Sequence, residues 1–344
     1  MENESYFLQD FDKTFGTYRV QDEDIHPEFK VKKPHHALTE TQYFTFSIPE
    51  VNIHAFLYLW YHPNLGVVGG GPIVFQGVKS IALAAELIDF RGYLPESQLG
   101  GTFCNYRLES GYSVEMLSPG TVFRVRYDDP ARHNRFDVML SAVAEPMVWP
   151  GSRHFEQTMR AQGELTLRGN HHKIDGFGIR DRSWGETRLE TPMPGPPASW
   201  ITGTFDEDFS FNITAFDHPD RDPLWKDRFA NEMPTKLDKF GWMIVDGQPV
   251  VIESTRKLVH YNRETLLHER IDIEIRDVRG RTFEISGQVT AAVPLNTWTN
   301  VRVPICLTRW ECGGRVGWGE VQEAQWNDFL EAHYARTQIQ RTGT

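Results

Sequence analysis

Short runs of alternating side chains, closely spaced along the chain, constrain its fold more than any other feature. From Gln42 onward, YFTFSI and IHAFLYLWYH alternate aromatic or β-branched residues with smaller or polar ones, which is typical of half-buried strands. Glycine, proline, asparagine and aspartate separate successive runs, as in HPNLGVVGGGP. Similar runs recur as far as VPICLTRWEC. This spacing predicts an all-β chain of antiparallel sandwiches or barrels, not of βαβ units.

The length and one proline-rich segment divide this β pattern into two parts. The chain has 344 residues, whereas a single hydrophobic core stops growing at about 250–300 residues. Four prolines fall between residues 192 and 197, where a sheet ladder would lose its donors. We therefore expect an N-terminal arm, a first β domain, a linker and a second β domain, at 1–40, 41–190, 191–198 and 199–335.

Helical periodicity is confined to a few segments. EVQEAQWNDFLEAHYARTQ, residues 320–338, places Trp326, Phe329, Leu330 and Tyr334 on one face of a C-terminal helix. We expect this helix to pack over a barrel end. SIALAAELIDFRG fits a short helix or a strand, and residues 217–240 are a long polar loop that could include a helical turn.

The charge and the chain ends exclude several classes of partner. With 47 acidic and 36 basic residues, the net charge is −11, which argues against nucleic acid or anionic membranes. The three cysteines are too few for a disulfide framework and lack zinc-ligand spacing. No secretory signal is apparent, and the longest apolar run, Ile53–Tyr61, is too short to cross a bilayer. We expect a cytoplasmic protein without an integral membrane segment; its oligomeric state is not readable.

The segment DGFGIRDRSWGETR, residues 175–188, concentrates charge inside a strand-like pattern. In a strand, Arg180, Arg182 and Trp184 share one face, while Asp181 and Ser183 share the other. A charge placed in an interior is costly unless it is paired. An aspartic acid desolvated among aromatic rings retains its proton and can serve as a general acid. The alternative is an Arg–Asp pair that locks a barrel end.

A second polar group, RHFEQTMRAQGEL, places His154 and Glu156 two residues apart on one face of a probable strand. They could position a ligand or a water, or form an ordinary structural pair. The adjacent histidine pairs at 35–36 and 171–172 would point to opposite faces, so we expect no metal site. GxSxG, P-loop and helix-opening GxGxxG motifs are absent from the sequence.

The two halves also end alike. GFGIRDRSWGE closes the first at residues 176–186, and GGRVGWGE closes the second at 313–320. Both carry Trp-Gly-Glu after a glycine-rich strand. This echo fits two related β units.

These motifs resemble those of a known superfamily. HFEQTMRAQGELTLRG followed by DGFGIRDRSWGETR is similar to the lipocalin-like superfamily of carotenoid 1,2-hydratases (hydroxyneurosporene synthases), kievitone hydratase and AttH-type proteins. The residues that match the pattern of that superfamily are Gly176, Gly178, Arg180, Asp181, Ser183, Trp184 and Gly185. The resemblance is most specific over residues 150–190 and extends over about 40–325. It implies two consecutive lipocalin-like antiparallel β-barrels or sandwiches around a hydrophobic cavity.

The resemblance also implies a chemistry, since the superfamily includes hydratases and cyclases. Hydrating an unactivated C=C bond needs a carbon-protonating acid and a cation-tolerant site; aromatic faces contribute about 0.5–2 kcal/mol each. Here the acid would be Asp181, with His154 or Glu156 positioning water. The cavity wall would include Trp184, Tyr43 and Trp318, and Arg180 would orient or pair.

The leading hypothesis is therefore a cofactor-free lyase or isomerase. It would act on a terpenoid-, prenyl- or polycycle-like hydrophobic molecule by acid-initiated hydration, dehydration or cyclisation. The first alternative is a non-catalytic lipocalin-type carrier of a small hydrophobic ligand. The second is a structural β protein in which Arg180 and Asp181 form a staple.

Overall fold

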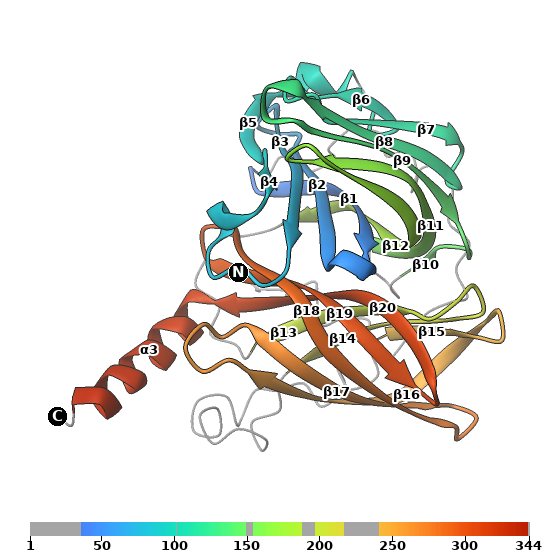
Figure 1. Ribbon diagram of the computed structural model, residues 1–344, viewed down its shortest axis with the longest axis vertical. Helices are drawn as coiled ribbons and strands as arrows, with labels where there is room; N and C mark the ends of the chain where they lie inside the picture. The colour runs from blue at the N-terminus through green and yellow to red at the C-terminus, as the bar shows by residue number, and fades with distance from the viewer. Residues whose placement is uncertain (1–35, 101, 149–153, 188–196, 217–240, 343–344) are drawn as a thin grey trace.

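Two β units stacked on each other make up the protein, with one helix projecting from the second (Figure 1). The computed structural model describes residues 36–100, 102–148, 154–187, 197–216 and 241–342. Strands account for most of these residues, so the predicted all-β class with a C-terminal helix is confirmed. The expected polar loop, most of the N-terminal arm and most of the proline-rich linker lie outside the described residues.

The first unit is a 12-stranded antiparallel sheet. Ten strands follow the order β4-β3-β2-β1-β12-β11-β9-β8-β7-β6, while β10 pairs with β11 and β5 with β3. Its strands are β1 (Leu38–Ile48), β2 (Ile53–His62), β3 (Val67–Gln76), β4 (Leu87–Ile88), β5 (Arg91–Pro95), β6 (Asn105–Arg107), β7 (Ser113–Ser118), β8 (Val122–Asp129), β9 (Asn134–Ala142), β10 (Met147–Val148), β11 (His154–Leu167) and β12 (Asn170–Thr187).

The second unit is a closed antiparallel barrel, in which β20 returns to pair with β13. Closure leaves no unpaired edge among the described strands of this unit. Its strands are β13 (Ala198–Thr204), β14 (Phe209–Phe216), β15 (Gly241–Val245), β16 (Gln248–Tyr261), β17 (His268–Asp277), β18 (Thr282–Trp298), β19 (Val301–Cys312) and β20 (Arg315–Trp326).

The terminal helix begins later than its sequence pattern predicts. β20 continues to Trp326, and α3 runs over Asn327–Thr342, so the first residues of the expected helix are strand. They pair with both β13 and β19, and this ladder outweighs their helical periodicity. Phe329 of α3 is buried against Leu266 at one end of the barrel. From there α3 extends away from both units (Figure 1).

Short 3-10 turns occur only between strands of the first unit within the described ranges. They are η2 (Pro49–Val51), η3 (Ala82–Ala84), η4 (Glu96–Leu99) and η5 (Pro130–Arg132). The segment SIALAAELIDFRG therefore forms η3, β4 and the start of β5 instead of a continuous helix. Among the described residues, no helix combines the length and apolarity needed to cross a membrane.

Alternation along the strands gives each unit its own core and leaves one shared layer between them. Phe44 and Phe46 of β1 point into the core of the first unit, while Phe211 and Trp310 fill the barrel. The shared layer, called here the interface cluster, joins aromatic residues of β1 and β2 to barrel residues such as Trp242 and Leu307.

Backbone hydrogen bonds reinforce this contact at one edge. Val78, just after β3, forms a parallel bridge with Ala292 of β18. The Lys79 amide donates to the Ala292 carbonyl at 2.7 Å, and the Ala292 amide donates to the Gly77 carbonyl at 3.2 Å. The two units are therefore joined by a core and by main-chain pairing.

Candidate active site between the two halves

Strand register brings several of the predicted site residues into one row. Tyr43 of β1 lies opposite Asp181 of β12, and Asp181 lies opposite Glu156 of β11. His154 lies opposite Ser183 in the same way. Residues directly opposite in an antiparallel pair point to the same face of the sheet. All five therefore face the barrel, and Asp181 among them is half-buried.

Glu156 is fully buried, and both of its oxygens accept hydrogen bonds from the barrel. The indole nitrogen of Trp200 donates to Oε1 at 2.8 Å, and that of Trp242 donates to Oε2 at 2.8 Å. His154 Nε2 lies 3.2 Å from Oε1, and His154 Nδ1 lies 2.6 Å from the Ser183 hydroxyl. A buried carboxylate of the first unit is thus partnered by the second.

A reciprocal arrangement surrounds Glu320 of β20. Its carboxylate accepts from the Tyr43 hydroxyl, which lies 2.7 and 2.6 Å from its two oxygens. The side-chain amide of Gln322 and His54 Nε2 also contact it. Burial, together with the charge of Glu320, raises the pKa of Tyr43 well above its usual value. Tyr43 therefore remains a protonated donor.

A small polar cavity of about 10 Å³ opens beside this group. Its lining includes Ser47, His54 and Glu320, with Thr202 and Trp318 of the barrel. This volume is close to the minimum of about 10–15 Å³ that one water molecule requires.

Aromatic rings surround the row on the barrel side. The Tyr43 ring centroid lies 5.0 Å from that of Phe56, 6.0 Å from that of Tyr58 and 6.2 Å from that of Trp200. Trp318 belongs to the same interface cluster. The site therefore combines carboxylates and histidines with rings that can face a cationic or apolar group.

Arg180 and Trp184 lie on the opposite face of β12, inside the first unit. The Arg180 guanidinium donates to the Gln157 amide oxygen at 3.0 Å and lies over the Phe123 and Phe155 rings at 4.3 and 4.8 Å. Its burial, helped by the charge of Arg182, lowers its pKa to about 9. The Trp184 ring lies 6.0 Å from that of Phe155.

The buried ion pair of the segment 175–188 is formed by Arg182. Arg182 donates to Glu40 Oε2 at 2.5 Å and to the Thr41 carbonyl at 2.8 Å. Its guanidinium also lies 4.4 Å from the Phe103 ring centroid. A staple therefore exists on this face, and it joins β12 to β1 through Glu40.

Sequence reasoning missed the barrel residues that complete the site. Trp200 and Trp242 carry no local signal, because their role depends on contact with the other unit. Glu320 had one: it is the glutamate of the second Trp-Gly-Glu. His54 lies in an alternating strand pattern at the same parity as Phe56 and Tyr58, which also face the barrel.

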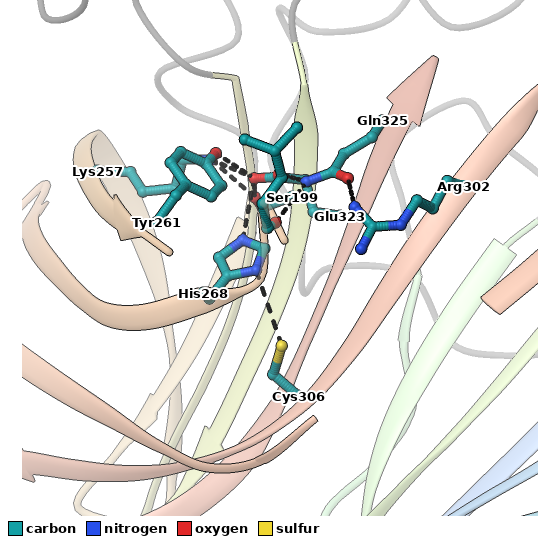
Figure 2. Close-up of polar contacts among 9 residues, drawn as sticks. Ser199, Lys257, Tyr261, His268, Arg302, Cys306, Glu323 and Gln325 are labelled. Atoms are coloured by element: carbon teal, nitrogen blue, oxygen red, sulfur yellow. Dashed lines mark hydrogen bonds and ion pairs between the residues drawn. The ribbon is translucent and has the colours of Figure 1, made fainter. Parts of the chain in front are cut away.

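A second polar group, called here the lumen cluster, lies inside the barrel (Figure 2). Glu323 accepts from the hydroxyls of Ser199 and Tyr261 at 2.9 and 2.8 Å, and it contacts His268 Nε2 at 3.1 Å and Lys257 Nζ at 3.7 Å. Burial, the largest single influence, would by itself lower the pKa of His268, but the charges of Glu323 and Cys306 and the hydrogen bonds to both together outweigh it and raise the pKa to about 10.

The lumen cluster continues toward the helix. His268 Nδ1 lies 3.7 Å from the Cys306 sulfur, and Gln325 links Glu323 to Arg302 (Figure 2). These residues come from β13, β16, β17, β19 and β20. Across the described ranges, no group of three or more His, Cys, Asp or Glu residues could hold a metal ion. The ion pairs of Glu323 with Lys257 and His268 join strands β16, β17 and β20 within the barrel.

The chain matches one protein family and resembles several solved structures. A family model described as a domain of unknown function, DUF7064, matches residues 20–328. No curated protein matches the chain. Among solved structures, a putative AttH from Nitrosomonas europaea aligns with a TM-score of 0.59 at 11% identity, covering 89% of this chain and 98% of that one.

CghA is also similar. It aligns with a TM-score of 0.54 at 11% identity, covering 83% of this chain and 88% of its own. Its structure with Sch210972 aligns at 0.52 and 11% identity, covering 86% and 96%. At such identities the likeness concerns the fold, and the resemblance to AttH-type proteins expected from the sequence motifs is confirmed at that level.

Proposed function

The chain belongs to the DUF7064 family, and from the site between its two halves we propose that it is a lyase or isomerase of the hydratase type. It would add water to a C=C bond of a hydrophobic, terpenoid-, prenyl- or polycycle-like molecule, remove water from such a molecule, or cyclise it. The observation that carries this proposal is the row of Tyr43, Asp181 and Glu156, held within the aromatic interface cluster.

In this proposal Asp181 protonates the alkene carbon. It is half-buried and lies directly opposite Tyr43, whose ring packs against other aromatic rings of the interface cluster. The cation that forms would face the rings of Tyr43 and Trp200, each contributing about 0.5–2 kcal/mol. Glu156, whose oxygens accept hydrogen bonds from the indoles of Trp200 and Trp242, would position those two rings and His154. Acid–base chemistry of this kind needs no cofactor.

The likeness to CghA, which has been solved with Sch210972, supports binding of a small molecule by a protein of this fold. The cavity at the row has room for about one water. A larger substrate must therefore displace side chains of the interface cluster when it binds. Binding is expected to be slow, since a packed layer has to rearrange.

The test uses isoprenoid alcohols and alkenes, with farnesol, geranylgeraniol and squalene as probes. Each is incubated with the protein in D₂O and, separately, in H₂¹⁸O, and products are analysed by mass spectrometry. Carbon-bound deuterium reports protonation, and ¹⁸O reports addition of water. We expect Asp181→Asn to lower both by about 10²–10⁴-fold, with probe affinity unchanged.

Asp175→Asn is the matched control. Asp175 lies on the same strand at the same parity but is exposed, where it pairs with Lys173 at 3.0 Å. It should retain wild-type turnover. If the wild-type protein binds a probe yet incorporates neither label, and Asp181→Asn binds it equally well, the protein is a carrier and not an enzyme.

A further inference from the structure

His54 lies between a hydroxyl and a carboxylate that come from different units. Ser47 is its cross-strand neighbour in the β1–β2 hairpin, and the Ser47 hydroxyl oxygen lies 3.0 Å from His54 Nδ1. His54 Nε2 contacts Glu320 of the barrel. Both Ser47 and His54 are buried. The order serine, histidine, glutamate is that of an activated hydroxyl, its base and the group that orients the base.

The hydrogen-bonding inventory sets the direction of the protons in this series. A carboxylate oxygen only accepts, so Nε2 of His54 donates to Glu320 and Nδ1 is left to accept from Ser47. The Ser47 oxygen then has lone pairs to accept a further hydrogen bond. The Tyr43 hydroxyl contacts both Glu320 oxygens and Gln322 donates to Oε1, which fixes the carboxylate beside His54.

The polar cavity of about 10 Å³ lies where that further hydrogen bond would form. Ser47, His54 and Glu320 all line it, together with the hydroxyl-bearing Thr202 and Thr204. A buried water needs about 10–15 Å³ and two to four polar partners. The cavity meets both requirements.

Resting on the proposed function, we propose that this cavity binds the water that is added or removed, and that Ser47, His54 and Glu320 form its proton relay. The water oxygen bonds to the cationic carbon while its proton passes to the Ser47 oxygen. The Ser47 proton passes to His54 Nδ1, and Glu320 stabilises the imidazolium. Dehydration reverses each transfer. Acid and base thus lie on either side of Tyr43, with Asp181 on β12 and His54 on β2.

Ser47 is the catalytic residue of this relay, because it takes the proton directly from the water, and His54 and Glu320 act through it. The two isotopes separate this role from a structural one. In His54→Gln and Ser47→Ala, we expect ¹⁸O incorporation into the probes to fall by about 100-fold. Deuterium incorporation should persist, since Asp181 still protonates carbon and the cation returns to the alkene.

His62→Gln is the matched control for His54→Gln. His62 lies on the same strand, is also buried, and has a hydroxyl neighbour, with Nδ1 at 3.2 Å from Thr39 Oγ1. It should leave both labels unchanged. Equal loss of deuterium and ¹⁸O in His54→Gln would show a structural role and overturn the relay, while the lyase proposal would stand.

A high-resolution crystal structure tests the relay without any substrate. We expect one ordered water bonded to Ser47 in the wild-type protein, and its loss in Ser47→Val, whose side chain fills the cavity. Absence of this water in the wild type overturns the relay whatever the activity. If the water is present but no probe takes up either label, the proposed function has failed, and the relay fails with it.

Discussion

Along β12, consecutive charged side chains point to opposite faces of the sheet. Arg182 turns into the first unit and pairs with Glu40, whereas Asp181 turns toward the barrel. The sequence predicted this division, because alternation along a strand is a local property. It could not supply Glu40 as the partner of Arg182, since the pairing of β1 with β12 joins positions more than 140 residues apart.

The Glu40–Arg182 pair gives a prediction about stability. Both side chains are buried, so Glu40→Gln leaves an uncompensated guanidinium inside the first unit. We expect a loss of about 3–5 kcal/mol in the free energy of unfolding, measured by chemical denaturation. Asp175→Asn, at an exposed ion pair, should change the free energy of unfolding far less. Equal losses for both variants would contradict the importance of burial.

At the scale of elements, the strands were predictable and their closure was not. Period-2 runs such as IHAFLYLWYH predict strands because each strand's side chains alternate regardless of which strand is its neighbour. Whether the sheet closes depends on pairing between distant strands, such as β13 with β20. The same pairing explains why EVQEAQW is strand despite its helical spacing.

The close approach of β13 and β20 depends on Gly319. A Cβ at this position would lie 2.0 Å from the Thr202 carbonyl oxygen. Gly319→Ala should therefore push β20 away from β13, move Glu320 from Tyr43 and cost about 1–3 kcal/mol. Gly176→Ala is the control, because its Cβ would meet its nearest atom at 3.6 Å. The measurements are the thermal midpoint and, for activity, probe turnover; similar results for both variants would contradict the argument.

The lumen cluster makes the stability of the barrel depend on pH. The pKa of His268 rises from 6.5 to about 10 on folding, so its contribution is complete below pH 6.5 and is lost as the pH rises toward 10. The pKa of Glu323 is lowered from 4.5, so its contribution is complete above pH 4.5 and is lost in acid. Stability from this pair should be greatest between pH 4.5 and 6.5.

Thermal unfolding of His268→Gln checks the alkaline side of this expectation. The decrease in midpoint between pH 6.5 and 10 should be smaller in the variant than in the wild type. His260→Gln is the control, since His260 is 47% exposed where it pairs with Asp272. An unchanged alkaline decrease in His268→Gln would show that other groups cause it.

At the scale of the whole molecule, the same hydrogen bonds build the candidate site and hold the two units together. Glu156 of the first unit accepts from Trp200 and Trp242 of the barrel, and Glu320 of the barrel accepts from Tyr43 and His54 of the first unit. Separating the units would remove these donors from both carboxylates and expose the interface cluster to water. The sequence alone could not predict these hydrogen bonds between the units, because each half of the site is incomplete without the other.

Because each unit supplies hydrogen-bond donors to a carboxylate of the other, we expect the two units to unfold together, although chains of this size often unfold domain by domain. Calorimetry of the full chain should show one transition with equal calorimetric and van't Hoff enthalpies. Trp242→Phe removes one donor to Glu156 and should lower the free energy of unfolding by about 1–3 kcal/mol. The midpoint of the single transition should fall accordingly. Far-ultraviolet circular dichroism and tryptophan fluorescence should shift together. Two resolved transitions, with only one displaced by Trp242→Phe, would show that the units are energetically independent and that the site can open without unfolding.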